Sequence, residues 1–185
     1  MEEVFSKLSA HFIKGMMVHD QMARYYDFLG LKGYKRIHEY QFYEESKVFR
    51  RINRYFINHH SKLIPELRVD DPALIPESWY NYKREDVDGQ TKRNAVETGM
   101  RKWVEWEQTT KTEIESAIKM LYDNGFVADA NWVKNILKKV CFELKKAERK
   151  LIELQSVSFD LILITEEQDK IHDKYKEKIK RNMCS

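Results

Sequence analysis

The sequence predicts an all-α protein: an antiparallel four-helix bundle with a long crossover between the second and third helices and an additional C-terminal helical segment. Three observations lead to this fold class. All three prolines lie in one short window, residues 65–76. On both sides of that window, apolar residues recur at steps of three and four, which is the helical period. No stretch of the sequence shows the polar–apolar alternation of a half-buried strand.

The first helix is expected at residues 2–28 and the second at 31–60. The acidic residues Glu2 and Glu3 suit the positive end of a helix dipole. Only a few residues around Gly30 separate the two segments, so they should form antiparallel neighbours. Gly15 lies inside the first helix, where glycine costs up to about 1 kcal/mol relative to alanine.

Residues 61–90 follow no helical period and are expected to form a crossover strap. A connection of about thirty residues is far longer than the usual limit of about 12 in a compact domain. Its apolar residues, which include Leu63, Trp79 and Tyr80, indicate that it lies along the bundle surface. Because a strap of this length can return to the starting end, the second and third helices should run parallel.

The third helix is expected at residues 92–123 and the fourth at 128–154, again as an antiparallel pair. Asn94 and Glu97 suggest a capping pair at the start of the third helix, and Asn124–Gly125 is a typical C-terminal stop. The last segment, residues 157–181, either continues the fourth helix or turns back as a separate one. A pattern that resembles a capping box at 165–168 favours the break.

Length and composition indicate one domain, residues 1–185, with a sizeable core. The 33 basic and 30 acidic residues give a net charge of +3, which does not indicate nucleic-acid binding. The lysines between Lys170 and Arg181 alternate with acids, which is typical of a solvated helix. Cys141 and Cys184 lie too far apart for metal-type spacing, and Cys141 is expected as a buried thiol.

The sequence also excludes several functional classes. It has no apolar run of the roughly 20 residues that a membrane span requires, so no membrane association is expected. The N-terminus lacks the basic-then-apolar order of a signal peptide, which predicts a cytoplasmic location. A Gly-rich phosphate loop, a Cys-x-x-Cys pair and a His-Glu-x-x-His motif are all absent from the sequence, so nothing supports a hydrolase or a nucleotide enzyme.

Four polar residues interrupt the apolar stripes and are the candidate metal ligands: His19, His38, Glu45 and Glu107. If the first turn is centred near residue 29, His19 and His38 should face each other, with Gln41 nearby, and Glu45 should face Glu107 at another level. Histidine and glutamate on facing helices are ligand types for iron or another first-row transition metal. The alternative is that these residues are half-buried and hydrogen-bonded to tyrosines, without any metal.

At this point the chain resembles the ferritin-like superfamily, which comprises ferritins, bacterioferritins and Dps proteins. Gly30 to Tyr34 (Gly-Leu-Lys-Gly-Tyr) is similar to the entry of the second ferritin helix, and it leads at similar spacing to Glu44–Glu45. The stretch from Trp103 to Gln108 is similar to the setting of the inward glutamate in the third ferritin helix. Residues 33–39 (Gly-Tyr-Lys-Arg-Ile-His-Glu) are also similar to a Dps motif. The resemblance covers roughly residues 1–155.

The resemblance implies a metal centre that oxidises iron, but the chain departs from that ligand set. Only Glu45 and Glu107 match positions of a ferritin oxidation centre. Phe12, Val48 and Cys141 occupy three positions where the resemblance implies ligands. In the Dps comparison His38 matches one ligand, but its partner position falls near Tyr26 and the acidic position four residues after His38 is Phe42.

Two functions therefore remain open. The first is a divergent ferritin-like protein with an incomplete oxidation centre, which acts as a homo-oligomeric scaffold. It would bind a protein partner through the exposed aromatic residues of the 61–90 strap, Trp79, Tyr80 and Tyr82. The alternative is a metal-binding protein that oxidises or sequesters iron through Glu45, Glu107, His19 and His38. Fold alone does not decide between them.

Overall fold

The computed structural model describes residues 1–75, 79 and 82–183, and it contains five long helices within those residues. A 3₁₀ turn, η2 (Arg84–Asp86), lies in the strap. The long helices have these bounds: α1 (Glu2–Phe28), α2 (Lys32–His60), α3 (Gly89–Asp123), α4 (Val127–Ser156) and α5 (Leu161–Met183). The predicted all-α class is confirmed, and helix ends differ from the expected ones by at most a few residues.

Two of the predicted boundaries were wrong for local reasons. α3 begins at Gly89 because the side chain of Asp88 accepts a hydrogen bond from the backbone N–H of Thr91, so Asp88 caps the helix in place of Asn94. The last segment does turn back, but the break falls at residues 157–160. There Asp160 accepts hydrogen bonds from the N–H groups of Ile162 and Leu163. The Thr165 hydroxyl instead donates to the carbonyl of Leu161 within the helix.

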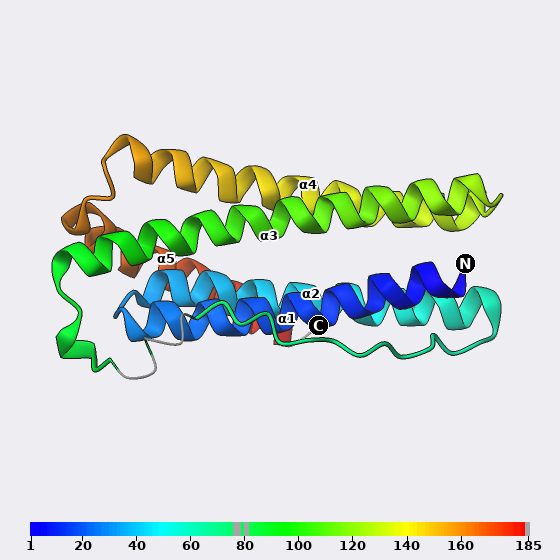
Figure 1. The fold of residues 1–185 in the computed structure, drawn as a ribbon, viewed down its shortest axis with the longest axis horizontal. Coiled ribbons are helices and arrows are strands. Elements are labelled where there is room, and N and C mark those ends of the chain that lie inside the picture. Colours follow the sequence, from blue (N-terminus) through cyan, green and yellow to red (C-terminus); the bar gives the residue numbers. More distant parts are fainter. Residues whose placement is uncertain (76–78, 80–81, 184–185) are drawn as a thin grey trace.

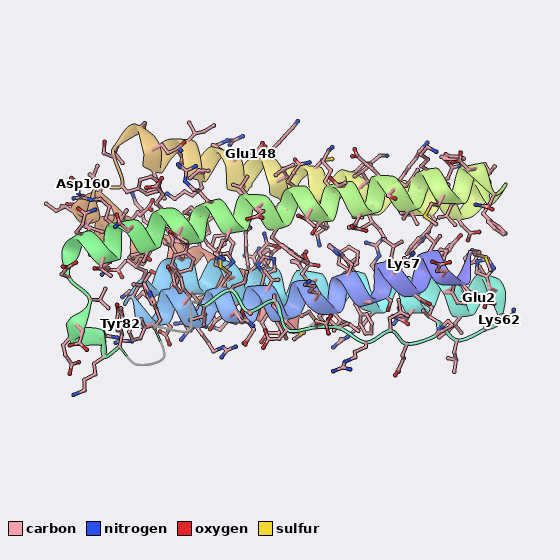
Figure 2. All side chains as sticks on the ribbon, viewed as in Figure 1. Glu2, Lys7, Lys62, Tyr82, Glu148 and Asp160 are labelled. Atoms are coloured by element: carbon pink, nitrogen blue, oxygen red, sulfur yellow. The ribbon has the colours of Figure 1, made fainter. Side chains whose placement is uncertain are left out.

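The helices form two antiparallel hairpins, α1–α2 and α3–α4, that pack face to face mainly through α1 and α3 (Figure 1). The strap crosses the full length of the bundle along α1, so that α2 and α3 run parallel as predicted. Figure 2 shows the start of the strap at Lys62, whose ammonium lies 2.8 Å from the Glu2 carboxylate. No helix in the described residues is long and apolar enough to cross a membrane.

Contacts with α1 hold the strap along its length. Trp79 stacks on the Tyr25 ring with centroids 5.0 Å apart, and the backbone N–H of Leu74 donates to Gln21. Arg84 donates to the carbonyl of Phe28 at the end of α1. Tyr80, which the sequence also places on this strap, lies outside the described residues.

The core consists of two hydrophobic clusters, one at each end of the bundle. One cluster surrounds Tyr26, Tyr34 and Trp103 and includes residues of α5. The other surrounds Phe5, Phe56 and the α3–α4 turn. Between them lies a layer of buried polar side chains. The polar residues that interrupt the apolar stripes of the sequence therefore lie in the middle of the bundle.

α5 packs along α2 and completes the first of these clusters. The side-chain oxygen of Gln168 accepts hydrogen bonds from the backbone N–H groups of Gly33 and Tyr34, at 2.9 and 3.2 Å. The side chain of Leu31, the N-cap residue of α2, accepts no hydrogen bond from the first N–H groups of the helix. Gln168 of α5 caps these groups in its place. A Cβ at Gly33 would lie 2.7 Å from the Gln168 carbonyl oxygen, so this close approach requires glycine.

Candidate functional site

The four candidate residues come from three helices and meet in the polar layer. His19 lies on α1, His38 and Glu45 lie on α2, and Glu107 lies on α3. All four side chains are buried, and both histidines have no exposed surface. The helical period of the sequence thus placed all four on the inward faces, as expected.

The two histidines are in direct contact. Nδ1 of His19 lies 3.1 Å from Nδ1 of His38, within hydrogen-bond distance. The other ring nitrogen of His19, Nε2, lies 4.0 Å from the Glu45 carboxylate and 3.9 Å from that of Glu107. The sequence suggested two separate levels, one for the histidines and one for the glutamates. The structure instead shows one cluster with His19 at its centre.

Aromatic side chains complete the surroundings of this cluster. The indole N–H of Trp103 donates to Oε1 of Glu107 at 3.0 Å. The His38 ring stacks on Tyr26, with centroids 5.3 Å apart, and meets Trp103 edge-on. Sequence reasoning missed the role of Trp103, although its spacing of four residues from Glu107 on one helix face is a usable signal.

Gly15 makes room for the Glu45 carboxylate. A Cβ at this position would lie 2.9 Å from Oε2 of Glu45 and 3.2 Å from the Trp106 ring. Gly15, which weakens the first helix relative to alanine, therefore lies directly against the polar layer. The space it leaves is occupied by a carboxylate oxygen that has no hydrogen-bond partner among the described residues.

Burial favours the neutral forms of these groups over the charged forms, and near pH 7 only Glu107 is partly ionised. Desolvation, reinforced by the charge of Glu107, raises the pKa of Glu45 well above its ordinary value. Desolvation also raises the pKa of Glu107 to about 7, against the hydrogen bond from Trp103 that lowers it. Burial lowers the pKa of His19 to about 3 and that of His38 well below its ordinary value. The cluster therefore carries little net charge.

A second polar network lies beside the cluster and joins α2 to α4. The Gln41 amide donates to Glu143 at 2.6 Å, and the Lys146 ammonium lies 2.8 Å from the same carboxylate. Lys139 pairs with Glu44 in the same way. The sequence identified Gln41 as inward but not its partners, because these lie about a hundred residues away in the chain.

The donor atoms are spaced more widely than the ligands of one bound ion. Metal–ligand bonds of about 2.1 Å in a tetrahedral site place neighbouring donor atoms about 3.4 Å apart, whereas His19 Nε2 is 3.9–4.0 Å from both carboxylates. Phe12 and Val48, at two positions where the resemblance implied ligands, are buried among apolar side chains. Among the described residues, no group of three or more His, Cys, Asp or Glu side chains is placed to hold a metal ion.

Solved structures with the same fold include several ferritins. A closed form of the Archaeoglobus fulgidus ferritin made by site-directed mutagenesis has a TM-score of 0.76 and 17% identity, over 93% of this chain and 94% of that one. The open-pore ferritin of the same archaeon has a TM-score of 0.75 and 16% identity, over 92% and 93%. A variant of PmFTN soaked in iron has a TM-score of 0.69 and 15% identity, over 88% of this chain and 92% of that one.

Comparison of the sequence alone gives no match, either to a protein-family model or to a curated protein. The similarity to the ferritins therefore lies in the arrangement of the helices, and it extends over about nine tenths of the chain. Helix order, the parallel α2 and α3, and the long strap all agree with the expectation drawn from the sequence. The chain has the ferritin-like fold.

Proposed function

We propose that this chain is a ferritin-like scaffold protein that forms homo-oligomers and binds a protein partner, and that it has no dinuclear oxidation centre. The observation that carries the proposal is the apolar packing of Phe12 and Val48, at two positions where the resemblance implies metal ligands. The buried polar cluster beside them carries little charge, because burial favours the protonated carboxyl group of Glu45 and the neutral, deprotonated imidazole of His19. It therefore needs no bound cation to balance its charge.

The strap offers the contact surface. Leu63 is 80% exposed, and Leu67 and Tyr82 are each 45% exposed. Trp79, which the sequence suggested as part of this surface, instead fixes the strap to Tyr25. A single exposed apolar residue is ordinary, but several on one extended segment favour a protein contact.

Metal content and iron oxidation test the first part of this proposal. We expect protein purified after growth with iron to contain no stoichiometric metal and to oxidise no Fe(II). Elemental analysis and a spectroscopic Fe(II) oxidation assay give the two readouts. Stoichiometric iron, together with turnover that Glu45→Ala and Glu107→Ala abolish, would refute the proposal.

The oligomeric state tests the second part. We expect the double variant Leu63→Asp/Leu67→Asp to lower the molar mass measured by light scattering after size exclusion. The matched control is Ile152→Asp/Ile162→Asp, which places the same charges at exposed apolar positions of α4 and α5. A monomeric wild type, or an equal loss of mass in the control, would contradict a contact through the strap.

A second candidate function, the binding of a single transition-metal ion such as iron, is favoured by one observation. His19 Nε2 and Glu45 Oε2 are buried and lack hydrogen-bond partners within the described part of the chain. Closure of the 3.9–4.0 Å separations by several tenths of an ångström would bring His19, Glu45 and Glu107 to ligand spacing. One bound metal equivalent without Fe(II) turnover, lost in Glu45→Gln, would support this function.

A further inference from the structure

A cleft between α4 and α5 lies outside the cluster described above. Its volume is about 440 Å³, which is within the usual range of small-molecule sites. We refer to it as the α4–α5 cleft. It is lined by Ile37, Trp103, Phe142, Glu143, Lys145, Lys146, Arg149, Lys150, Glu153, Glu167, Ile171, Lys174, Tyr175 and Lys178.

The floor of the α4–α5 cleft is apolar and aromatic. Ile37, Trp103 and Tyr175 are all buried, and the Tyr175 ring meets that of Tyr40 edge-on with centroids 5.5 Å apart. Phe142 stands at the rim and is 67% exposed. Such a floor accommodates the body of an organic molecule.

The sides of the cleft are strongly basic. Six cationic side chains face three carboxylates, which gives an excess of three positive charges in one cleft. This excess equals the net charge of the whole chain, +3, so the residues outside the cleft carry no net charge in total.

The lining carboxylates pair with only two of these six cations. Glu143 pairs with Lys146, and both Glu153 and Glu167 pair with Lys150. The other four lining cations have no carboxylate partner among the described residues: Lys145, Arg149, Lys174 and Lys178. An unneutralised group of cations beside an apolar floor is suited to an anion.

The spacing of the cations along the two helices also favours an anion-binding site. Lys145 and Arg149 are four residues apart on α4, and Lys174 and Lys178 are four apart on α5. Like charges at this spacing repel each other and destabilise a helix. A bound anion would remove that repulsion on both helices.

Three ammonium groups converge on one ring at the floor. Nζ of Lys178 lies 4.9 Å from the Tyr175 ring centroid, Nζ of Lys146 lies 5.2 Å from it and Nζ of Lys174 lies 5.9 Å from it. The ring attracts all three cations by cation–π interaction. They are thus placed together, before any ligand arrives, beside the apolar surface.

From these observations we propose that the α4–α5 cleft binds a small organic anion with an apolar or aromatic body. The anionic group would lie between Lys178 and Arg149, and the body on Ile37 and Tyr175. A divalent metal ion is disfavoured here, because the excess positive charge repels it. The proposal is therefore independent of whether the central cluster binds metal.

Fluorescence titration with 8-anilinonaphthalene-1-sulfonate, an aromatic monoanion, tests the proposal. The neutral probe N-phenyl-1-naphthylamine has a similar body without the charge. We expect one anion site per chain, with an affinity that falls as salt rises. The double variant Arg149→Gln/Lys178→Gln should bind the anion at least about tenfold more weakly, equivalent to about 1.4 kcal/mol. Its affinity for the neutral probe should not change.

Two controls make the result specific to the cleft. Arg51→Gln/Arg54→Gln removes the same charge from exposed positions of α2 and should change the affinity by less than about twofold. Lys178→Arg keeps the charge and should keep the affinity. If the first double variant does not give the wild-type circular dichroism, Lys145→Gln/Lys174→Gln replaces it with the same expected loss.

Several outcomes would overturn the proposal. They are the absence of anion binding to the wild type, wild-type affinity in the cleft variant, and an equal loss in the Arg51/Arg54 control. Equal affinity of the wild type for the charged and neutral probes would also overturn it, because the cations would then contribute nothing.

Discussion

Glu107 shows how the surroundings of a single residue fix its chemistry. Its carboxyl group is almost fully buried, accepts one hydrogen bond from Trp103 and lies 3.9 Å from a neutral imidazole. Burial outweighs the hydrogen bond and raises its pKa from the ordinary 4.5 to about 7. The folded chain therefore retains a proton between these two values that the unfolded chain has already released.

This difference predicts how stability depends on pH. The stabilisation from the retained proton is fully present below pH 4.5 and is lost as the pH rises to about 7. Gln at position 107 is neutral at every pH and still accepts the hydrogen bond from Trp103. Between pH 4.5 and 8 we therefore expect Glu107→Gln to gain about 3 kcal/mol in unfolding free energy relative to the wild type.

Urea unfolding across this pH range measures the effect. The control is Glu148→Gln, an exposed side chain on the outer side of α4 (Figure 2), whose profile should parallel that of the wild type. A constant difference between Glu107→Gln and the wild type at all pH values would show that the pKa of Glu107 is not raised in the folded chain.

For single residues, the sequence predicts which side chains point inward but not which residues they contact. The period of three and four residues placed His19, His38, Glu45 and Glu107 correctly, because it depends only on helix geometry. The hydrogen bond from Trp103 and the partnership of His19 with both carboxylates depend on side-chain rotamers and on helix rotation. Periodicity fixes neither of these.

At the scale of the element, α2 depends on α5 for its beginning. Its first N–H groups have no local side-chain cap, and Gln168 accepts two of them from a position more than 130 residues away. A capping pattern in the sequence involves only neighbouring residues, so it cannot predict a cap that another helix supplies. The same reasoning wrongly assigned Gln168 to a capping box of its own helix.

We expect Gln168→Leu to destabilise the protein by about 2–4 kcal/mol. Leucine cannot accept a hydrogen bond, so it leaves two buried N–H groups without partners, each costing about 1–3 kcal/mol. Hydrogen exchange should also become faster at the start of α2 and throughout α5. The control, Thr165→Val, alters an exposed residue of α5 and should change stability by less than about 0.5 kcal/mol. Equal effects of the two substitutions would refute the capping role.

At the scale of the whole molecule, the polar layer divides the core into two apolar clusters. The sequence predicted the hairpins, the strap and the parallel α2 and α3, because segment lengths and breaks constrain them strongly. It did not predict that α5 packs against α2. The apolar stripe of α5 indicates that the helix is buried on one side, but several grooves of a bundle satisfy that requirement equally.

The polar layer itself should lower the stability of the fold. It contains buried nitrogen and oxygen atoms without hydrogen-bond partners in the described part of the chain, on His19, His38 and Glu45. Replacement of buried polar groups by apolar side chains of similar volume is often neutral or stabilising by about 1–4 kcal/mol. A layer that reduces stability is retained for another reason, which is either a function of the cluster or the correct alignment of the two hairpins.

A quadruple variant separates these two reasons: His19→Leu, His38→Leu, Glu45→Met and Glu107→Gln. Gln at position 107 keeps an acceptor for Trp103, so no new unpaired donor arises. If the layer serves a function, the variant should keep its helix content and its oligomeric size and should melt at least about 3 °C higher at pH 8. Circular dichroism and light scattering measure these properties.

If the layer instead aligns the hairpins, the variant should show several oligomeric sizes or a broad unfolding transition at a lower temperature, because apolar layers permit α1 to slide along α3. The direction of the change in melting temperature thus indicates whether the buried histidines and carboxylates stabilise the fold or belong to a site.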